Sequence, residues 1–198
     1  VLLLITNSTF YIAAKLYDQS PSDIIAKVSR QGASISNDDF FRVPLDPLNS
    51  KRAGYRFQVN MNSVRNEGIF LNITSINDDW TSIWEAKATQ TSYGWSTEVA
   101  IPFNSLSFDR ETDVWGFNVF RYISRKNELI SWITRNQESN ISVSGSLSGF
   151  KGIQKGLGLD VVPNLSFQSS SNDETGVSED MFQPSLDVFY KITPSLNG

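Results

Sequence analysis

Hydrophobic and polar residues alternate at every second position along most of the chain. The alternation places Phe10, Ile12 and Ala14 on one face of an extended segment, and it recurs in three further segments. These segments carry Phe41, Val43 and Leu45, then Tyr55, Phe57 and Val59, then Ile69, Leu71 and Ile73. A period of two is typical of strands with one buried face, so the pattern predicts antiparallel β-structure. Residues 20–30 differ, because their helical spacing after Ser-Pro predicts a short connecting helix.

Residues 83–102 predict a β-hairpin with its turn near residues 91–94. In the expected register, paired residue numbers sum to about 183, which places Glu85 opposite Glu98. The apolar set of this hairpin is expected to face the core: Trp84, Ala86, Ala88, Trp95, Val99 and Ile101. A second strand pair is expected over residues 115–125 and 129–134, with Trp115 in the core. Strands at this spacing predict a sandwich of two antiparallel sheets.

The composition changes after about Gly149. Two alternating series, residues 157–167 and 182–192, flank a polar segment, residues 169–180, that we expect to be a loop. Each series has the length and the apolar-polar pattern of a tilted transmembrane β-strand, about 11 residues. A soluble hairpin or an extension of the sandwich would show the same alternation, so both interpretations stay open. The predicted domains are residues 1–153 and residues 154–198.

The composition excludes several kinds of chemistry. The 198 residues include no Cys and no His, which excludes disulfide frameworks, zinc fingers, Cys nucleophiles and a Ser-His-Asp triad. The formal net charge is −4, and its 17 basic residues are scattered among 21 acidic ones, so no basic stripe predicts a nucleic-acid partner. The apolar run Val1–Ile5 is too short for a membrane helix and lacks the features of a signal peptide. We expect the chain to be a piece of a longer protein.

Four residues are candidates for ligand contacts because of their type and their expected position. Trp80 lies in a predicted loop and Trp132 near a strand end, where an exposed ring can cover the face of a sugar. Plugging the end of a sandwich is the alternative role for such rings. Arg56 and Arg121 lie on strands rich in aromatic residues, where arginine acts either as a structural clamp or as a ligand contact.

Two acidic groups suggest further chemistry. Glu85 and Glu98, if about 5 Å apart, would suit a retaining glycosidase, although Lys87 nearby favours a structural ion pair. Hard oxygen ligands for Ca²⁺ are offered by a second group, Asp38, Asp39, Asp46 and Asn49. The second group lacks the fixed spacing of an EF-hand, and turn formation by Asp and Asn explains it equally well.

Several motifs occur in an order that carries a family resemblance. They are DFFRVPLDPLNS at residues 39–50, GYRFQVN at 54–60, GWSTEVAIPF at 94–103 and WGFNVFR at 115–121. Together they resemble the carbohydrate-binding module family 9 superfamily, and in particular the sandwich that precedes a β-barrel in a bacterial outer-membrane family of unassigned function. The resemblance runs from about Phe10 to the end of the chain.

The resemblance implies a jelly-roll sandwich, incomplete at its N-terminus, followed by the first strands of an outer-membrane β-barrel. It also implies a location in the bacterial cell envelope, at the periplasmic face of the outer membrane. One or two opening strands would precede Val1, which would leave a gap at one sheet edge. Sugar-binding members carry calcium, which the resemblance therefore suggests as a cofactor.

Sugar-binding members clasp the reducing end of a sugar between two Trp rings with polar side chains on its hydroxyls. The ring positions fall near Ser36 and Ser142, and the polar positions fall near Arg42 and Gln58. None of these is the residue type that the clasp uses. The family likeness therefore implies carbohydrate without implying that this particular site binds it.

Three hypotheses for function remain open. The leading one is a non-catalytic carbohydrate-recognition domain of a bacterial cell-envelope protein, with a glycan and the outer membrane as partners. The second is a structural adaptor or gating domain of an outer-membrane barrel with no sugar ligand. The third is a glycoside hydrolase that uses Glu85 and Glu98.

Overall fold

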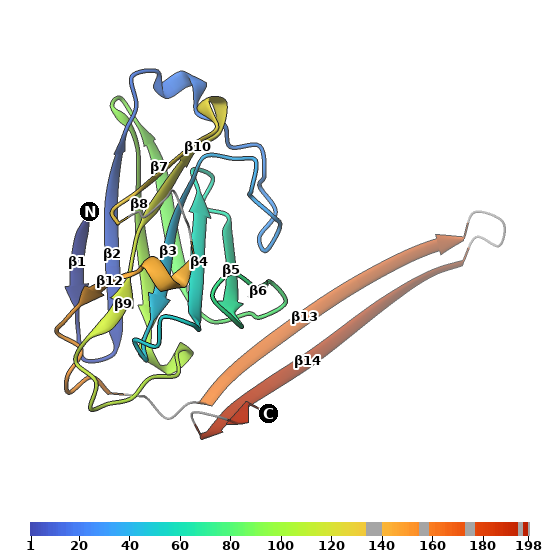
Figure 1. Cartoon of the computed structure of the whole chain (residues 1–198). Coiled ribbons are helices and arrows are strands. Elements are labelled where there is room, and N and C mark those ends of the chain that lie inside the picture. Colours follow the sequence, from blue (N-terminus) through green and yellow to red (C-terminus); the bar gives the residue numbers. More distant parts are fainter. Residues whose placement is uncertain (134–139, 155–158, 173–176, 194–195, 198) are drawn as a thin grey trace. The chain divides into compact units, whose positions relative to one another are not determined.

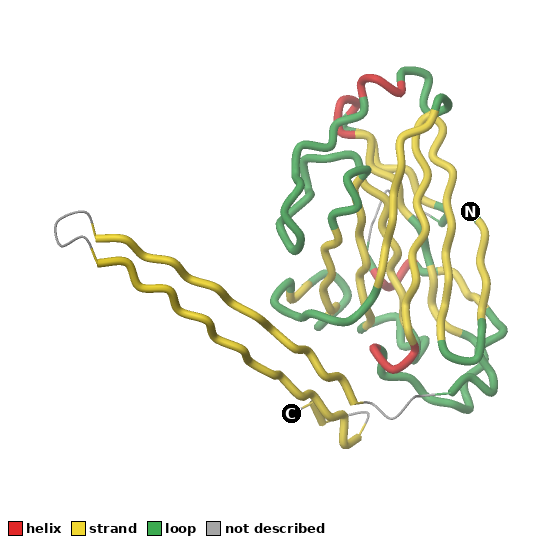
Figure 2. The backbone as a smooth tube through the Cα atoms, turned by 180° about the vertical axis from the view of Figure 1, so that it is seen from behind, coloured by secondary structure: helices red, strands yellow, loops and turns green. Residues whose placement is uncertain are grey.

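The computed structural model describes residues 1–133, 140–154, 159–172, 177–193 and 196–197. Strands make up most of it, and every pair of neighbouring strands is antiparallel, which confirms the predicted all-β class (Figure 1). The helical segments are single 3₁₀ turns in the connections between strands (Figure 2). Those in the described part are Pro21–Asp23, Phe103–Ser105, Ser124–Lys126 and Ile141–Val143.

The chain divides into two compact units, Val1–Lys155 and Gly156–Gly198. The first unit is a sandwich of two sheets, as the alternation predicts. One sheet has the strand order β1-β2-β8-β7, so that β1 and β7 form its edges. Its strands are β1 (Leu2–Ile5), β2 (Thr9–Tyr17), β7 (Glu85–Thr91) and β8 (Gly94–Pro102).

The other sheet has eight strands. Its order is β11-β10-β3-β4-β5-β6, and β9, which carries β12, pairs with the end of β3. The bounds are β3 (Phe40–Asp46), β4 (Gly54–Asn60), β5 (Arg65–Phe70), β6 (Ile76–Asn77), β9 (Trp115–Phe117), β10 (Phe120–Ile123), β11 (Glu128–Ser131) and β12 (Gly145–Leu147). β10 pairs with the start of β3 and β9 with its end, and both lie on the side of β3 that β4 does not occupy.

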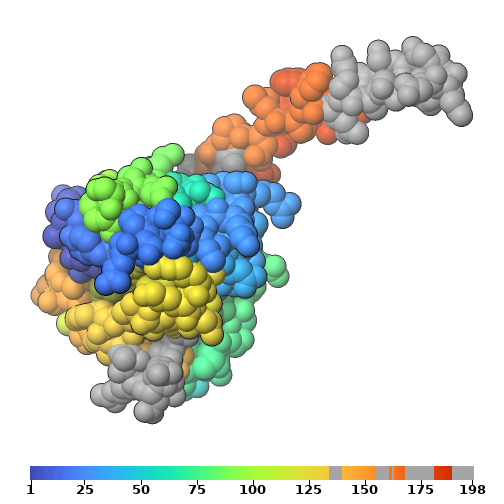
Figure 3. All heavy atoms as spheres, turned by 90° about the horizontal axis from the view of Figure 1, so that it is seen from above, coloured from blue at the N-terminus to red at the C-terminus, as the bar shows by residue number. Residues whose placement is uncertain are grey.

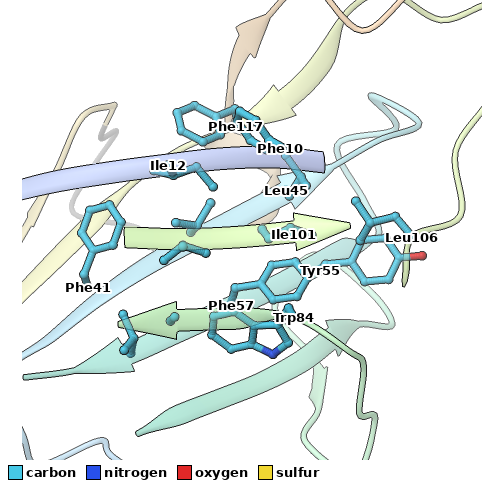
Figure 4. Packing of buried hydrophobic residues seen from close by; sticks show 14 of the residues in the cluster. Phe10, Ile12, Phe41, Leu45, Tyr55, Phe57, Trp84, Ile101, Leu106 and Phe117 are labelled. Atoms are coloured by element: carbon cyan, nitrogen blue, oxygen red, sulfur yellow. The ribbon is translucent and has the colours of Figure 1, made fainter. Parts of the chain in front are cut away.

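The core lies between the two sheets and is built from the residues that alternate inward. Phe10 and Ile101 from the first sheet meet Leu45 and Phe57 from the second, and Figure 4 shows these side chains directed toward one another. All three tryptophans predicted for the core are buried, namely Trp84, Trp95 and Trp115. Each large apolar side chain contributes about 1.5–3 kcal/mol when fully buried, so this cluster is the main source of stability.

The helix predicted over residues 20–30 is wrong beyond its first turn. The 3₁₀ turn begins at Pro21 as expected, but Ile24 is already extended. The reason lies in the backbone amides that follow: Ile25 N–H donates to Asp39 Oδ1, and the Lys27 and Val28 amides donate to Asp38. These side chains take the donors that an α-helix would use within itself, so the helix does not form.

Two predicted strands end earlier than expected. β5 ends at Phe70, the Leu71 N–H donates to Ser75 O in a turn, and the Leu71 side chain is 64% exposed. The strand expected over residues 115–125 is divided into β9 and β10. Asn118 lies at the break, where its side chain donates to Ile133 O (2.7 Å) and accepts from Ile133 N (3.0 Å), replacing ladder hydrogen bonds.

The second unit is a long antiparallel hairpin. Its strands are β13 (Leu159–Asn172), β14 (Val177–Thr193) and the short β15 (Leu196–Asn197). The loop predicted for residues 169–180 is wrong, since Ser169 pairs with Asp180 and the strands continue to Asn172 and Val177. Leu157, at the start of the first series, lies outside the described residues.

Apolar side chains share one face of this hairpin. Val161 pairs with Val188, Leu165 with Pro184 and Phe167 with Phe182. These side chains are exposed within the chain. The intervening positions carry polar groups, such as Asn164, whose amide donates to Asp187 Oδ2. In the described part of the chain, no helix has the length and hydropathy to cross a membrane.

Candidate functional site

A cleft of about 640 Å³ opens between the two sheets beside β1. Its floor is apolar and comes from both sheets, with Leu3 and Leu16 on one side and Phe41 and Phe117 on the other. Beside the cleft, β1 is the edge of its sheet, and β9 and β12 extend the opposite sheet. We call this region the aromatic cleft.

Trp132 forms one wall of the aromatic cleft. It follows β11 directly, is 55% exposed, and its ring lies 5.9 Å from that of Phe117 at an interplanar angle of 53°. The ring also lies against β12 at Gly145, where a Cβ atom would come within 2.9 Å of its Cζ3. Glycine therefore lets the ring pack on the strand. The result is an aromatic ring held on one side and open on the other.

Arg121 closes the end of the aromatic cleft through an ion-pair network. Its Nη2 lies 3.1 Å from Asp18 Oδ2, and its Nη1 donates to the Tyr17 carbonyl. Arg125 holds the same carboxylate in a bidentate pair, with Nη2 to Oδ1 at 2.6 Å and Nη1 to Oδ2 at 2.9 Å. Figure 3 shows the yellow segment that carries both arginines against the blue start of the chain. The network ties β10 to the end of β2.

Burial and neighbouring charges shift the pKa values of this network in opposite directions. The hydrogen bond from Arg125 lowers the pKa of Asp18 below its ordinary value. Burial lowers the pKa of Arg121, while the carboxylates of Asp18, Asp39 and Glu128 oppose this shift. Arg121 thus serves as the clamp that the sequence suggests, and it also lines the cleft. The structure brings Trp132 and Arg121 together, although they were predicted as separate candidates.

Further polar groups line the same cleft. Lys15 and Tyr17 lie at the end of β2, and Ser131 lies at the end of β11. The Tyr17 ring is exposed and packs on Tyr93 with 5.1 Å between centroids. Neither Lys15 nor Ser131 was a candidate from the sequence. Their only signal there was position, since Lys15 lies near the end of β2 and Ser131 ends β11. Hydrogen-bonding groups therefore surround an apolar floor.

Trp80 and Arg56 lie elsewhere and have structural partners. The Trp80 ring packs on Tyr55 and Phe57, with centroids 5.0 and 6.2 Å apart, and so covers the core. Arg56 Nη2 lies 2.8 Å from Asp78 Oδ1 and donates to Asn66 Oδ1 at 2.6 Å. Neither lines the aromatic cleft.

The positions that correspond to the family's polar clasp meet on neighbouring strands. Arg42 on β3 pairs with Gln58 on β4, and Arg42 Nε donates to Gln58 Oε1 at 2.8 Å. Burial, assisted by the positive charge of Arg56, lowers the pKa of Arg42 to about 10. The two side chains thus bind each other.

The prediction that Glu85 and Glu98 lie directly opposite each other is wrong. Glu85 pairs with Ala100, and Glu98 pairs with Lys87. The physical reason is the turn: a two-residue loop joins Thr91 to Gly94, so that paired numbers sum to 185. The predicted faces are unaffected, and both glutamates are exposed on the outer face. They line a depression of about 420 Å³ together with Lys87. This arrangement gives no support to a two-carboxylate hydrolase.

The acidic residues considered for calcium have other partners. Asp38 accepts from the Lys27 and Val28 amides at 3.0 Å, and Asp39 Oδ1 accepts from the Ile25 and Ser124 amides. At the opposite end of β3, Asp46 Oδ2 accepts from the Lys51 amide at 2.7 Å, and the turn that follows places Asn49 at a φ of 49°. Within the described residues no group of three or more His, Cys, Asp or Glu side chains is placed to hold a metal ion. These residues therefore fit turn formation and do not fit a calcium site.

Known structures resemble this sandwich. Two structures of a family 9 carbohydrate-binding module from Caldicellulosiruptor kristjanssonii, one in complex with cellotriose and one with glucose, both have a TM-score of 0.52. This chain shares their fold. The sequence identities are 16% and 18%, the likeness covers 74% of this chain in both cases, and it covers 71% and 73% of those chains. The sequence matches no protein-family model and no curated protein.

Proposed function

We propose that this chain is a non-catalytic carbohydrate-recognition domain whose ligand binds in the aromatic cleft. The observation that carries the proposal is the fixed, half-exposed Trp132 ring beside Arg121 and Ser131. The cleft volume of about 640 Å³ lies within the range typical of small-molecule sites. The fold shared with modules solved in complex with cellotriose and glucose supports the same ligand class.

The chemistry of a pyranose suits this arrangement. One face of the ring carries C–H groups, which pack on an aromatic surface, while the hydroxyls at its edge need donors and acceptors. Trp132 offers the surface, and Arg121, which pairs with Ile130 two positions before it, offers a guanidinium at its edge. Because Phe117 and Gly145 hold the Trp132 ring from behind, little side-chain entropy is lost on binding.

Replacing Trp132 by alanine is expected to weaken saccharide binding at least about tenfold, since the stacking surface is lost. Isothermal titration of the full chain against neutral and acidic oligosaccharides measures the effect. Tyr11→Ala is the matched control, because Tyr11 is an exposed aromatic on the outer face of the four-stranded sheet and does not line the aromatic cleft. Absence of binding to every saccharide at millimolar concentration would overturn the proposal.

Tryptophan fluorescence gives an independent measurement. Trp132 is the most exposed of the five tryptophans, since three are fully buried in the core and Trp80 is partly buried. Iodide should therefore quench mainly Trp132, and a bound saccharide should protect it. Protection that persists in the Trp132→Ala variant would show that the ligand binds elsewhere.

We further propose that the second unit contributes strands to an outer-membrane barrel, with the sandwich at the periplasmic face of a bacterial outer membrane. The supporting observation is the hairpin face that carries Val161, Leu165 and Phe167 opposite Phe182 and Val188, all exposed within the chain. A band of this kind matches the lipid-facing side of tilted transmembrane strands. Apolar residues on this face and polar residues at the intervening positions account for the two-residue alternation of the hairpin sequence.

Fractionation of the source bacterium tests the location. An antibody against residues 1–155 should detect the full-length protein in the outer-membrane fraction, where detergent but not high salt releases it, because lipid contact is apolar. A peripheral protein of the inner membrane serves as the control for the fractionation. Recovery in the cytosol, or release by salt alone, would contradict the proposal.

A further inference from the structure

The charge of the aromatic cleft differs from that of the whole chain. The chain has a formal net charge of −4, yet the charged residues that line the cleft are Arg121 and Lys15, which lies on β2 beyond its pairing with β1. No carboxylate lines the cleft among the residues that the structure describes. We infer that the saccharide bound here is acidic, and that Lys15 and Arg121 recognise a carboxylate such as that of a uronic acid. The inference rests on the proposed function and narrows its ligand class.

The nearest carboxylate leaves this positive charge incompletely balanced. Asp18 makes its two shorter contacts with Arg125, at 2.6 and 2.9 Å, and a single longer one with Arg121 at 3.1 Å. One carboxylate thus faces two guanidinium groups. Arg121 Nε is also buried and has no hydrogen-bond partner among the described residues.

Two further carboxylates act on Arg121 from outside the cleft. Asp39 and Glu128 both favour its charged form, but neither forms an ion pair with it in the described part of the chain. Asp39 uses one oxygen to bind the Ile25 and Ser124 amides. Lys15 has no ion pair among the described residues either. The cleft wall therefore carries two cationic residues and, among the described residues, no carboxylate.

Both parts of a uronic acid, its pyranose ring and its carboxylate, suit the aromatic cleft. Its pyranose ring can stack on Trp132 like a neutral sugar, while its carboxylate projects from the edge of the ring. Hydrogen bonds between a cation and a carboxylate are about twice as strong as neutral ones, and an apolar surrounding strengthens them further. The apolar floor of Leu3, Phe41 and Phe117 provides that surrounding.

Titration of the full chain with trigalacturonic acid and with its trimethyl ester tests the inference, because the two probes share one skeleton and differ in charge. The free acid should bind at least about tenfold more tightly than the ester at low salt. Raising the salt to about 0.5 M should reduce the difference, since ions screen exposed charges. Lys15→Met should weaken binding of the acid several-fold and leave binding of the ester unchanged.

Lys87→Met is the matched control. Lys87 is also an exposed strand lysine of the same sheet, but it lies opposite Glu98 and outside the aromatic cleft, so this change should affect neither probe. Equal affinity for acid and ester would overturn the inference and leave the proposed function standing. Binding of neither probe nor of any neutral saccharide would overturn the proposed function itself.

Discussion

Replacing Gly94 by alanine is expected to destabilise the sandwich by about 3–5 kcal/mol, the largest effect of any single change that we predict. Gly94 begins β8 and has a φ of +139°, which residues with a side chain rarely adopt. A Cβ atom there would overlap the Leu16 carbonyl oxygen and lie 2.9 Å from the Asp18 amide. Both are backbone atoms of β2 or of its continuation, so the strand itself must shift.

The loss at Gly94 has two causes, the strained backbone φ and the overlap of the Cβ atom with β2, and Gly32→Ala separates them. Gly32 also has a positive φ, +75°, but a Cβ atom there would meet nothing within 4 Å. It should therefore cost about 1–2 kcal/mol, from backbone strain alone. Urea denaturation followed by circular dichroism measures both variants. Equal losses would mean that the close approach of β2 to Gly94 contributes nothing.

The identity of the buried faces could be predicted from the sequence because it depends on a local property. Side chains alternate across a strand at every second residue, so Phe10, Ile12 and Trp95 were assigned to the core correctly. An error in register by one residue on each strand does not change this assignment. For this reason the predicted faces of the β7–β8 hairpin are confirmed, although the predicted pairing of Glu85 with Glu98 is wrong.

Strand ends and turns depended on side chains from distant parts of the chain. The Ile25, Lys27 and Val28 amides bind Asp39 or Asp38, which lie ten or more positions later. Asn118 likewise ends β9 by bonding to Ile133. Periodicity within a window carries no information about such partners, so a helix was expected in the first case and one continuous strand in the second.

The site was predictable only in its separate parts. An exposed Trp132 near a strand end and an arginine at residue 121 are both visible in the sequence. Their meeting in one cleft depends on the order of strands in two sheets, which places β1 and β2 opposite β9, β10 and β12. Sequence spacing does not determine that order. Lys15 was missed for the same reason, since an exposed strand lysine is an ordinary surface residue unless it borders a cleft.

Replacing Asp18 by asparagine is expected to destabilise the sandwich by about 2–3 kcal/mol at neutral pH. The Asp18 side chain is 2% exposed and bonds to both Arg121 and Arg125. Removing one partner of a fully buried ion pair costs about 3–5 kcal/mol. The two arginine side chains are 13% and 21% exposed, so water compensates part of the loss. Asp79→Asn, at an exposed position, is the control and should change stability little.

The pH dependence of this difference identifies its cause. The hydrogen bond from Arg125 holds the folded-state pKa of Asp18 below its ordinary value, while the unfolded-state pKa is about 3.9. A lowered pKa means that the stabilisation by Asp18 is complete above the unfolded value and is lost as the pH falls through the folded value. The gap in unfolding free energy between the native chain and Asp18→Asn should therefore be constant from about pH 8 to pH 5 and shrink below about pH 4. Urea denaturation across this range measures it. A gap that stays constant down to about pH 2 would mean that packing, and not the charge of Asp18, holds β2 to β10.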